Sequence, residues 1–271
     1  MKSTLYLKTS LLLLATLTCF AQNQSFKWPK EARMAISLTF DDARGSQATK
    51  GAPLLDEYGV KGTFYVVPSA VKGQLAGWKK VVDKKHEIGN HSLNHSCSGN
   101  FVWSRKSALE NYTIDQMRTE LLEANTQIET LLGVKPESYA YPCGQTFVGR
   151  GKNAKSFVPV IADLFVSGRT WLDEAPVDAG YCDMAQLTGV EMDGKDFEHL
   201  LPVIEEAKKN GQWLVLAGHE MADSGAQTTR LAMLRKLCAY AKDPANGIWI
   251  APVGEVARYV KGERKRLGLA E

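Results

Sequence analysis

The sequence predicts an α/β protein whose strands form a closed or nearly closed (β/α) barrel of seven or eight mainly parallel strands. Short apolar runs alternate along the chain with helical patterns, and this alternation is typical of a mainly parallel sheet. The runs recur over about 245 residues without a low-complexity linker or a repeat, which suits a single domain. A doubly wound open sheet is the alternative. In both architectures, functional groups gather at the carboxyl ends of the strands.

Several segments have the length and apolar character of buried strands. The stronger candidates are residues 34–40, 62–67, 137–141, 162–167, 212–217 and 248–251, and the weaker ones are 87–89 and 186–190.

Helical patterns fall between these segments. The clearest follows Thr113, because Thr113 and Gln116 form a capping-box pattern, and it continues to Gly133, a residue type that commonly follows a helix end. Residues 197–210 and 228–242 each place apolar side chains on one side at helical spacing.

Residues 1–21 have the features of a secretory signal peptide. Lys2 and Lys8 flank the start of a short leucine-rich segment, and Ala21 is a small residue at the expected cleavage position. The segment is too short to span a membrane, and no second apolar stretch of spanning length follows. We therefore expect an exported protein, periplasmic or secreted, with its catalytic domain over residues 26–271.

The composition is that of an ordinary globular protein. The formal net charge is +3 over 271 residues, and 44% of the residues are hydrophobic. A charge this small gives no electrostatic footprint for nucleic acid, so we expect no nucleic-acid partner. The hydrophobic content excludes a disordered chain.

The cysteines leave the disulfide pairing open. Cys19 lies in the signal segment, in a context that suits a lipoprotein anchor poorly. The other four, Cys97, Cys143, Cys182 and Cys238, allow three pairings in an oxidising compartment. None of them forms a C-x-x-C pair, so the sequence does not predict a cysteine-based zinc site.

Two adjacent carboxylates, Asp41 and Asp42, follow the strand at 34–40. Large and small side chains alternate along this strand, and successive side chains point to opposite faces. If the alternation continued, Asp42 would follow Phe40 into the apolar layer, where a charge is costly. We therefore expect the strand to end near Phe40, with both carboxylates at its C-terminal end, where the barrel opens. An ordinary turn rich in Asp is the alternative.

Three of the five histidines point to a site at the same end of the barrel. His91 and His95 are four residues apart, so on a helical turn their imidazoles would share a face and converge on one cation. With one carboxylate they would form a three-ligand site that leaves room for water, as in catalytic metal centres. His219 follows the strand at 212–217 and would suit a general acid. Surface or core histidines are the alternative for each.

Four short motifs occur in the order found in the polysaccharide deacetylases, a family of metal-dependent carbohydrate esterases. They are residues 39–42 (TFDD), 91–95 (HSLNH), 141–144 (YPCG) and 218–219 (GH). The resemblance covers nearly all of residues 26–271, and its first two motifs are the specific ones. It implies a distorted (β/α) barrel and a hydrolase that removes N- or O-linked acetyl groups from a carbohydrate through a metal-activated water.

The resemblance also implies residue roles. Asp41 would be the general base and His219 the general acid. Asp42, His91 and His95 would bind a divalent metal, with zinc the default for such ligands and nickel, cobalt or manganese also compatible. The backbone N–H of Cys143, in a position where the family usually has tyrosine, would help to hold the oxyanion.

Two family features have no clear counterpart. The arginine that usually pairs with the catalytic aspartate is replaced by Ala140, and Arg44, Arg150 and Arg169 are candidates to substitute for it. The aspartate that orients the general-acid histidine also has no clear match, and its candidates are Asp173, Asp178 and Asp183.

Two other functions are compatible with these residues. The first is a carbohydrate-binding protein that keeps the metal but turns over weakly because the arginine is missing. The second is a family member that hydrolyses a C–N bond outside sugars. Trp78, Trp103, Trp171 and Trp213 could stack on sugars or belong to the core. The partner we expect is an acetylated polysaccharide or oligosaccharide. The polymer, the type of acetyl linkage and the oligomeric state are not predicted.

Overall fold

The computed structural model describes residues 25–171 and 175–270. The predicted signal peptide, residues 1–21, and the candidate Asp173 lie outside the described residues. Within the described part of the chain, no helix has both the length and the apolar character needed to cross a membrane.

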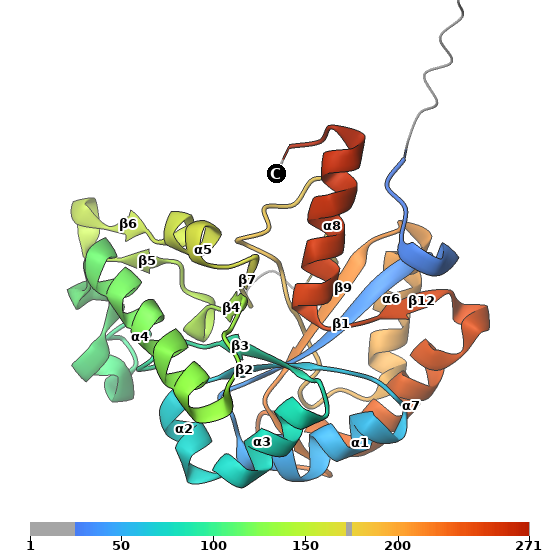
Figure 1. Ribbon diagram of the computed structural model, residues 1–271, viewed down its shortest axis with the longest axis horizontal. Helices are drawn as coiled ribbons and strands as arrows, with labels where there is room; N and C mark the ends of the chain where they lie inside the picture. Colours follow the sequence, from blue (N-terminus) through green and yellow to red (C-terminus); the bar gives the residue numbers. More distant parts are fainter. Residues whose placement is uncertain (1–24, 172–174, 271) are drawn as a thin grey trace, which may run out of the picture.

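An eight-stranded sheet forms the centre of the protein (Figure 1). Its order is β7-β4-β3-β2-β1-β9-β8, β12 pairs with β1, and all of these pairings are parallel. The strands are β1 (Met34–Asp41), β2 (Thr63–Val66), β3 (Glu87–Asn90), β4 (Ser138–Ala140), β7 (Ser167–Arg169), β8 (Val190–Glu191), β9 (Trp213–Gly218) and β12 (Ile248–Ile250).

The segment that leads into β8 connects the two ends of this order. Leu187 forms a parallel bridge with Arg169 of β7, while β8 itself pairs with β9. The sheet therefore curls into a distorted barrel, since β7 and the segment before β8 are joined by one isolated bridge instead of a full ladder. The predicted α/β barrel class is confirmed.

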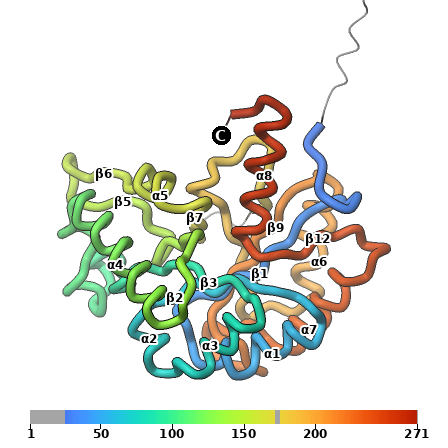
Figure 2. The backbone as a smooth tube through the Cα atoms, in the orientation of Figure 1, coloured from blue at the N-terminus to red at the C-terminus, as the bar shows by residue number. Residues whose placement is uncertain are grey.

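The helices surround the sheet, as the tube in Figure 2 also shows. They are α1 (Ala52–Glu57), α2 (Pro68–Gly73), α3 (Leu75–Asp83), α4 (Ile114–Leu132), α5 (Val158–Leu164), α6 (Phe197–Lys209), α7 (Leu231–Lys242) and α8 (Val253–Leu267). Two small pairs of strands lie off the barrel: β5 (Phe147–Val148) with β6 (Lys155–Ser156), and β10 (Glu220–Ala222) with β11 (Thr228–Arg230).

The capping box predicted at Thr113 is present at the start of α4. The Thr113 hydroxyl accepts a hydrogen bond from the Gln116 N–H at 3.2 Å, and the Gln116 side chain accepts one from the Thr113 N–H at 2.8 Å. Gly133 ends the helix with φ 71°, a left-handed conformation that glycine adopts without strain.

Three predicted elements are wrong in type or extent. The weak strand candidate at 186–190 forms a strand only from Val190 onward. Residues 162–167 were expected to form a strand, but α5 occupies residues 162–164 and β7 begins at Ser167. Pro159 stands in the first turn of α5, where its missing N–H costs no hydrogen bond, and the following apolar residues pack on the core as a helix. The pattern at 228–242 divides similarly, because residues 228–230 form β11 and the helix begins only at Leu231.

Strand β1 is buried along its whole length and has neighbours on both edges. β9 pairs along one edge, whereas the other edge is shared by β12 at Met34–Ile36 and by β2 at residues 39–41. Its large apolar side chains belong to the core cluster shared with the surrounding helices. Its small residues face the opposite side, as the alternation predicts.

Candidate metal centre and active site

The two aspartates lie on opposite sides of the end of β1, and their backbone conformations differ. The strand continues to Asp41, one residue further than predicted, and Asp41 is buried. Asp42 then adopts φ 77° and Ala43 φ 56°. This left-handed turn takes the Asp42 side chain out of the strand alternation, so it does not enter the apolar layer behind Phe40.

His91 and His95 are brought together by a turn and not by the helical turn that the sequence suggested. His91 follows β3 directly, and Ser92 and His95 both have positive φ. The Ser92 N–H bonds the Asn90 side chain at 2.6 Å, and the Ser92 hydroxyl accepts a hydrogen bond from the His95 N–H at 2.9 Å. These two bonds reverse the chain, so the imidazole centroids lie 4.9 Å apart.

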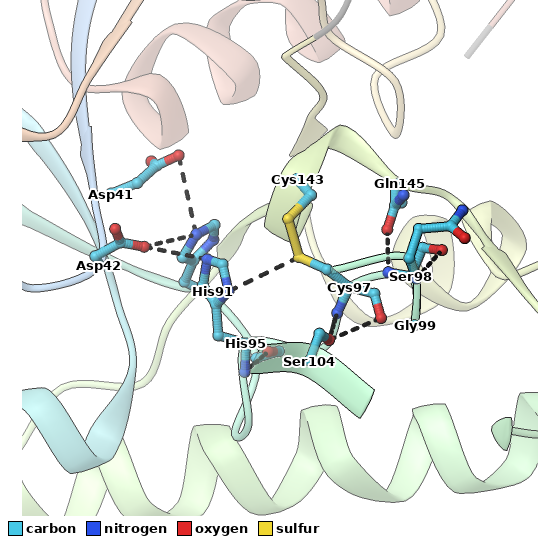
Figure 3. The surroundings of a disulfide bond; sticks show 12 residues. Asp41, Asp42, His91, His95, Cys97, Ser98, Gly99, Ser104, Cys143 and Gln145 are labelled. Carbon is cyan, nitrogen blue, oxygen red and sulfur yellow. Dashed lines mark hydrogen bonds and ion pairs between the residues drawn. A yellow bond between two sulfur atoms is a disulfide. The ribbon is translucent and has the colours of Figure 1, made fainter. Parts of the chain in front are cut away.

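The three predicted metal ligands converge (Figure 3). Asp42 Oδ1 lies 3.4 Å from His91 Nε2 and 3.2 Å from His95 Nε2. Among the described residues this buried oxygen has no hydrogen-bond partner. His91 Nδ1 lies 2.9 Å from the Ala140 carbonyl, to which it can only donate, so Nε2 is left with its lone pair toward Asp42. An orphaned carboxylate oxygen between two imidazole nitrogens fits a divalent cation.

The electrostatics of this cluster are those of a carboxylate held by two imidazoles. Burial raises the pKa of Asp42, but the interactions with the His91 and His95 imidazoles outweigh it and hold the pKa well below its usual range. Burial lowers the pKa of His95, and the interactions with Asp42 outweigh it and raise the pKa. Asp42 is therefore ionised at neutral pH and can attract a cation.

Arg169 pairs with Asp41 inside the barrel. Its Nη2 donates to Asp41 Oδ1, and both side chains are buried. In the register between β4 and β7, Arg169 lies directly opposite Ala140, the position where the family usually has arginine. Side chains at paired positions of a parallel sheet point to the same face, so this arginine reaches the aspartate from the adjacent strand.

The other two candidate arginines lie elsewhere. Arg44 forms a two-pronged interaction with the metal-ligand candidate Asp42, at 2.9 and 3.1 Å, and also bonds Gln227. Arg150 is exposed and bonds Asn111. Of the three substitutes that the sequence suggested for the missing arginine, only Arg169 contacts Asp41 within the described residues.

His219 is oriented by Asp193, which the sequence analysis missed. The imidazole Nδ1 lies 2.7 Å from Asp193 Oδ2, and the other Asp193 oxygen accepts hydrogen bonds from the His219 N–H and the Thr229 hydroxyl. The Trp171 ring stacks on the imidazole with centroids 4.7 Å apart. The remaining nitrogen, Nε2, is the atom left for proton transfer.

Two of the three candidates proposed for this role do not fill it, and the third, Asp173, lies outside the described residues. The Asp178 and Asp183 side chains instead bond nearby backbone N–H groups, those of Gly180 and Ala185. One signal could have identified Asp193: it follows the weak strand candidate at 186–190, so the strand-end rule that selected Asp41 also applies to it.

Cys143 is cross-linked to Cys97, which resolves one of the open pairings (Figure 3). Cys182 and Cys238 are free thiols. Cys143 has φ 54° and sits in the turn after β4, at the wall of the site. The disulfide joins this turn to the segment that follows His95. The Cys97 sulfur also lies 3.9 Å from His95 Nδ1.

All six predicted site residues line one cleft of about 790 Å³. Trp103 and Trp171 also line it, whereas Trp78 and Trp213 are buried in the core. The volume lies within the usual range for small-molecule sites. The set lining the cleft includes Asp41, Asp42, His91, His95, Cys143 and His219.

Comparison with known proteins agrees with this geometry. Residues 29–156 match the family model described as polysaccharide deacetylase. The chain is 32% identical over 108 residues to the peptidoglycan-N-acetylmuramic acid deacetylase PdaA of Bacillus subtilis, a match that covers 40% of this chain and 37% of that protein. The chain spans about a third or less of the length of the curated relatives it matches.

Solved structures share the fold. The PuuE allantoinase aligns with a TM-score of 0.64 at 15% identity, over 93% of this chain and 98% of its own. The Xyl-CE4 domain of a multidomain xylanase from the hindgut metagenome of Trinervitermes trinervoides aligns with a TM-score of 0.54 at 19% identity, over 84% and 91%. The predicted resemblance to the polysaccharide deacetylases is confirmed: residues 29–156, which carry the first three motifs, match the family model, and the barrel agrees with it.

Proposed function

We propose that this chain is a metal-dependent hydrolase that removes N- or O-linked acetyl groups from a carbohydrate. The observation that carries the proposal is the orphaned Asp42 oxygen facing two imidazole nitrogens, in the cleft that Asp41 and His219 also line. The family match supports carbohydrate deacetylation, and relatives such as the deacetylase PdaA point to the same chemistry.

Asp42, His91 and His95 would hold the cation. Zinc is the default for this donor set, and nickel, cobalt or manganese also fit it. When bound, a divalent cation would supply a water of lowered pKa and would polarise the acetyl carbonyl.

Asp41 would act as the general base. One of its oxygens is bound by Arg169, and the other, Oδ2, lies 3.9 Å from His91 Nε2 and so faces the proposed metal position. The arginine thereby fixes the carboxylate so that its free oxygen can accept a proton from the attacking water.

His219 would act as the general acid. Its Nδ1–H donates to Asp193, which holds the ring and stabilises the imidazolium, while Nε2 would deliver a proton to the departing nitrogen or oxygen. The Cys143 N–H, at the cleft wall, would stabilise the negative charge that develops on the carbonyl oxygen.

The alternative of a binding protein without turnover loses its main support. It depended on an unpaired catalytic aspartate, and Arg169 supplies the missing partner. We also propose that residues 26–271 form the catalytic domain and that the protein is exported, as a chain acting on extracellular polysaccharide would be.

Acetate release from acetylated xylan, chitin oligomers and peptidoglycan, with and without a chelator, tests the function. We expect release from at least one substrate, its loss with chelator and its recovery with added zinc. Absence of release from every substrate would contradict the proposal.

Two variants test the residue roles. His91→Ala should lose metal and activity together, because one of three ligands is gone. Asp41→Asn should keep the metal and lose most turnover, about 100-fold or more. Elemental analysis measures the metal content of both variants. A His91→Ala protein with full metal content would exclude the ligand role of His91.

A further inference from the structure

A segment beside the metal centre exposes large apolar side chains. Phe101, Val102 and Trp103 are 43%, 71% and 62% exposed, respectively. The Phe101 and Trp103 rings stack with centroids 5.5 Å apart, and the Trp103 ring lies 5.8 Å from that of His95. Both rings line the catalytic cleft, and Val102 is not among its lining residues. Exposed aromatic rings at the rim of a cleft mark a binding surface.

The segment that carries these rings, residues 97–110, is held firmly at its base. The disulfide from Cys97 to Cys143 fixes one end to the cleft wall (Figure 3). The buried Ser104 hydroxyl accepts from the Cys97 N–H at 2.9 Å and donates to its carbonyl at 2.8 Å. We call residues 97–110 the aromatic loop.

Glu110 closes the other end of the aromatic loop. Its carboxylate accepts hydrogen bonds from the Ser98 hydroxyl at 2.6 Å and from the Gly99 N–H at 2.9 Å. The Ser98 N–H also donates to the Gln145 side chain at 2.6 Å. The exposed rings therefore lie on a loop that hydrogen bonds and the disulfide already hold in place. A ligand that stacks on the rings does not have to order the loop first.

The cleft chemistry suits a sugar. A pyranose ring has an apolar C–H face that stacks on an aromatic ring, and its edge carries hydroxyl groups. Trp103 offers such a ring, while Arg44 and Gln227 line the same cleft and offer polar groups. A mixed aromatic and polar lining of this kind is typical of small-molecule sites.

The groove continues past the acetyl site. A second cleft of about 360 Å³ shares Gly144 with the first, and its lining includes Phe147, which is 58% exposed. Together the two clefts offer more room than a single sugar attached to the reacting acetyl group needs.

We propose that Trp103, backed by Phe101, is a stacking site for a sugar unit next to the one that carries the reacting acetyl group. The preferred substrates are then oligosaccharides or polysaccharides and not monosaccharides. The inference rests on the proposed function for the position of the acetyl group.

The test compares Trp103→Ala with Val102→Ala, a matched control on the same loop. Acetate release is measured with N-acetylglucosamine hexamers, acetylated xylohexaose and 4-nitrophenyl acetate. We expect Trp103→Ala to raise KM for a hexamer about five- to tenfold with kcat within about twofold. The loss of activity should be smaller for 4-nitrophenyl acetate, which has no neighbouring sugar unit, and Val102→Ala should resemble the parent throughout.

Calorimetric binding of the same hexamers, in an Asp41→Asn background that does not turn over, separates this inference from the proposed function. If the parent releases no acetate but hexamer binding still depends on Trp103, the proposed reaction fails and the stacking site stands. Equal KM and affinity for Trp103→Ala and Val102→Ala would overturn the inference. So would failure of both hexamers to bind, or an equal loss of 4-nitrophenyl acetate hydrolysis in Trp103→Ala.

Discussion

The pair formed by Arg169 and Asp41 predicts a large cost when the arginine is replaced by methionine. Both side chains are buried, and within the described residues the other guanidinium nitrogens, Nε and Nη1, have no hydrogen-bond partner. Removing one partner of a buried ion pair leaves the other charge unsolvated and costs about 3–5 kcal/mol. For a protein of this size, Tm should fall by about 6–20 °C.

Thermal unfolding followed by circular dichroism measures the stability cost, and acetate release measures the catalytic one. We expect Arg169→Met to lose about 100-fold or more in kcat, because Asp41 is no longer held with one oxygen toward the metal position. Arg150→Met is the matched control: this arginine is exposed, and its loss should change the free energy of unfolding by less than about 0.5 kcal/mol.

A double variant tests whether strand register explains the pairing. Ala140 lies opposite Arg169, so Ala140→Arg combined with Arg169→Ala should return a guanidinium to the same face of the barrel. We expect it to recover part of the Tm and kcat lost in Arg169→Ala. If Arg169→Met is as stable and active as the parent, the buried pair is not what holds Asp41.

Three further outcomes follow from the structure. Asp193→Asn should lower amide hydrolysis about 10²–10⁴-fold but affect 4-nitrophenyl acetate far less, since that leaving group needs no protonation; equal losses would contradict the acid role. Burial lowers the pKa of His86 to about 4 in the folded protein. Between pH 4 and 6.5, His86 is therefore protonated more in the unfolded chain than in the folded one. Stability should fall by up to about 2 kcal/mol from pH 7 to 5, and chemical denaturation of His86→Asn should show a smaller loss. Replacing Cys97 and Cys143 by serine removes a cross-link between residues 46 positions apart and should lower the free energy of unfolding by about 4 kcal/mol. An unchanged denaturant midpoint would refute this.

Local chemistry made much of the site predictable. The alternation along β1 predicted that a carboxylate could not continue into the apolar layer, and the structure resolves the conflict with a left-handed turn at Asp42. Imidazoles four residues apart suggested convergence, and they do converge. The path differs, because positive φ at Ser92 and side-chain hydrogen bonds replace the expected helical turn.

The partners of the proposed catalytic side chains, Asp41 and His219, were harder to predict from the sequence. Arg169 was one of three candidates because its role depends on the register of β4 against β7, and a single sequence does not show which residues of two strands lie opposite each other. Asp193 was missed because the strand before it, Val190–Glu191, is too short to give a clear apolar run. The strand expected at 162–167 was wrong since a short apolar run does not distinguish a strand from a buried helix.

The pairing of β1 has a consequence for how the protein folds. The strand comes early in the chain, yet it is enclosed by β9 and β12, about 180 and 210 residues later. Contacts this distant in sequence slow folding and keep apolar strands exposed until the last elements are present. Residues 29–156, which carry the family match, would leave β1 with one edge bare if made alone. We expect such a fragment to aggregate: the proposed metal ligands come from the first half of the chain, but a stable barrel requires the second half.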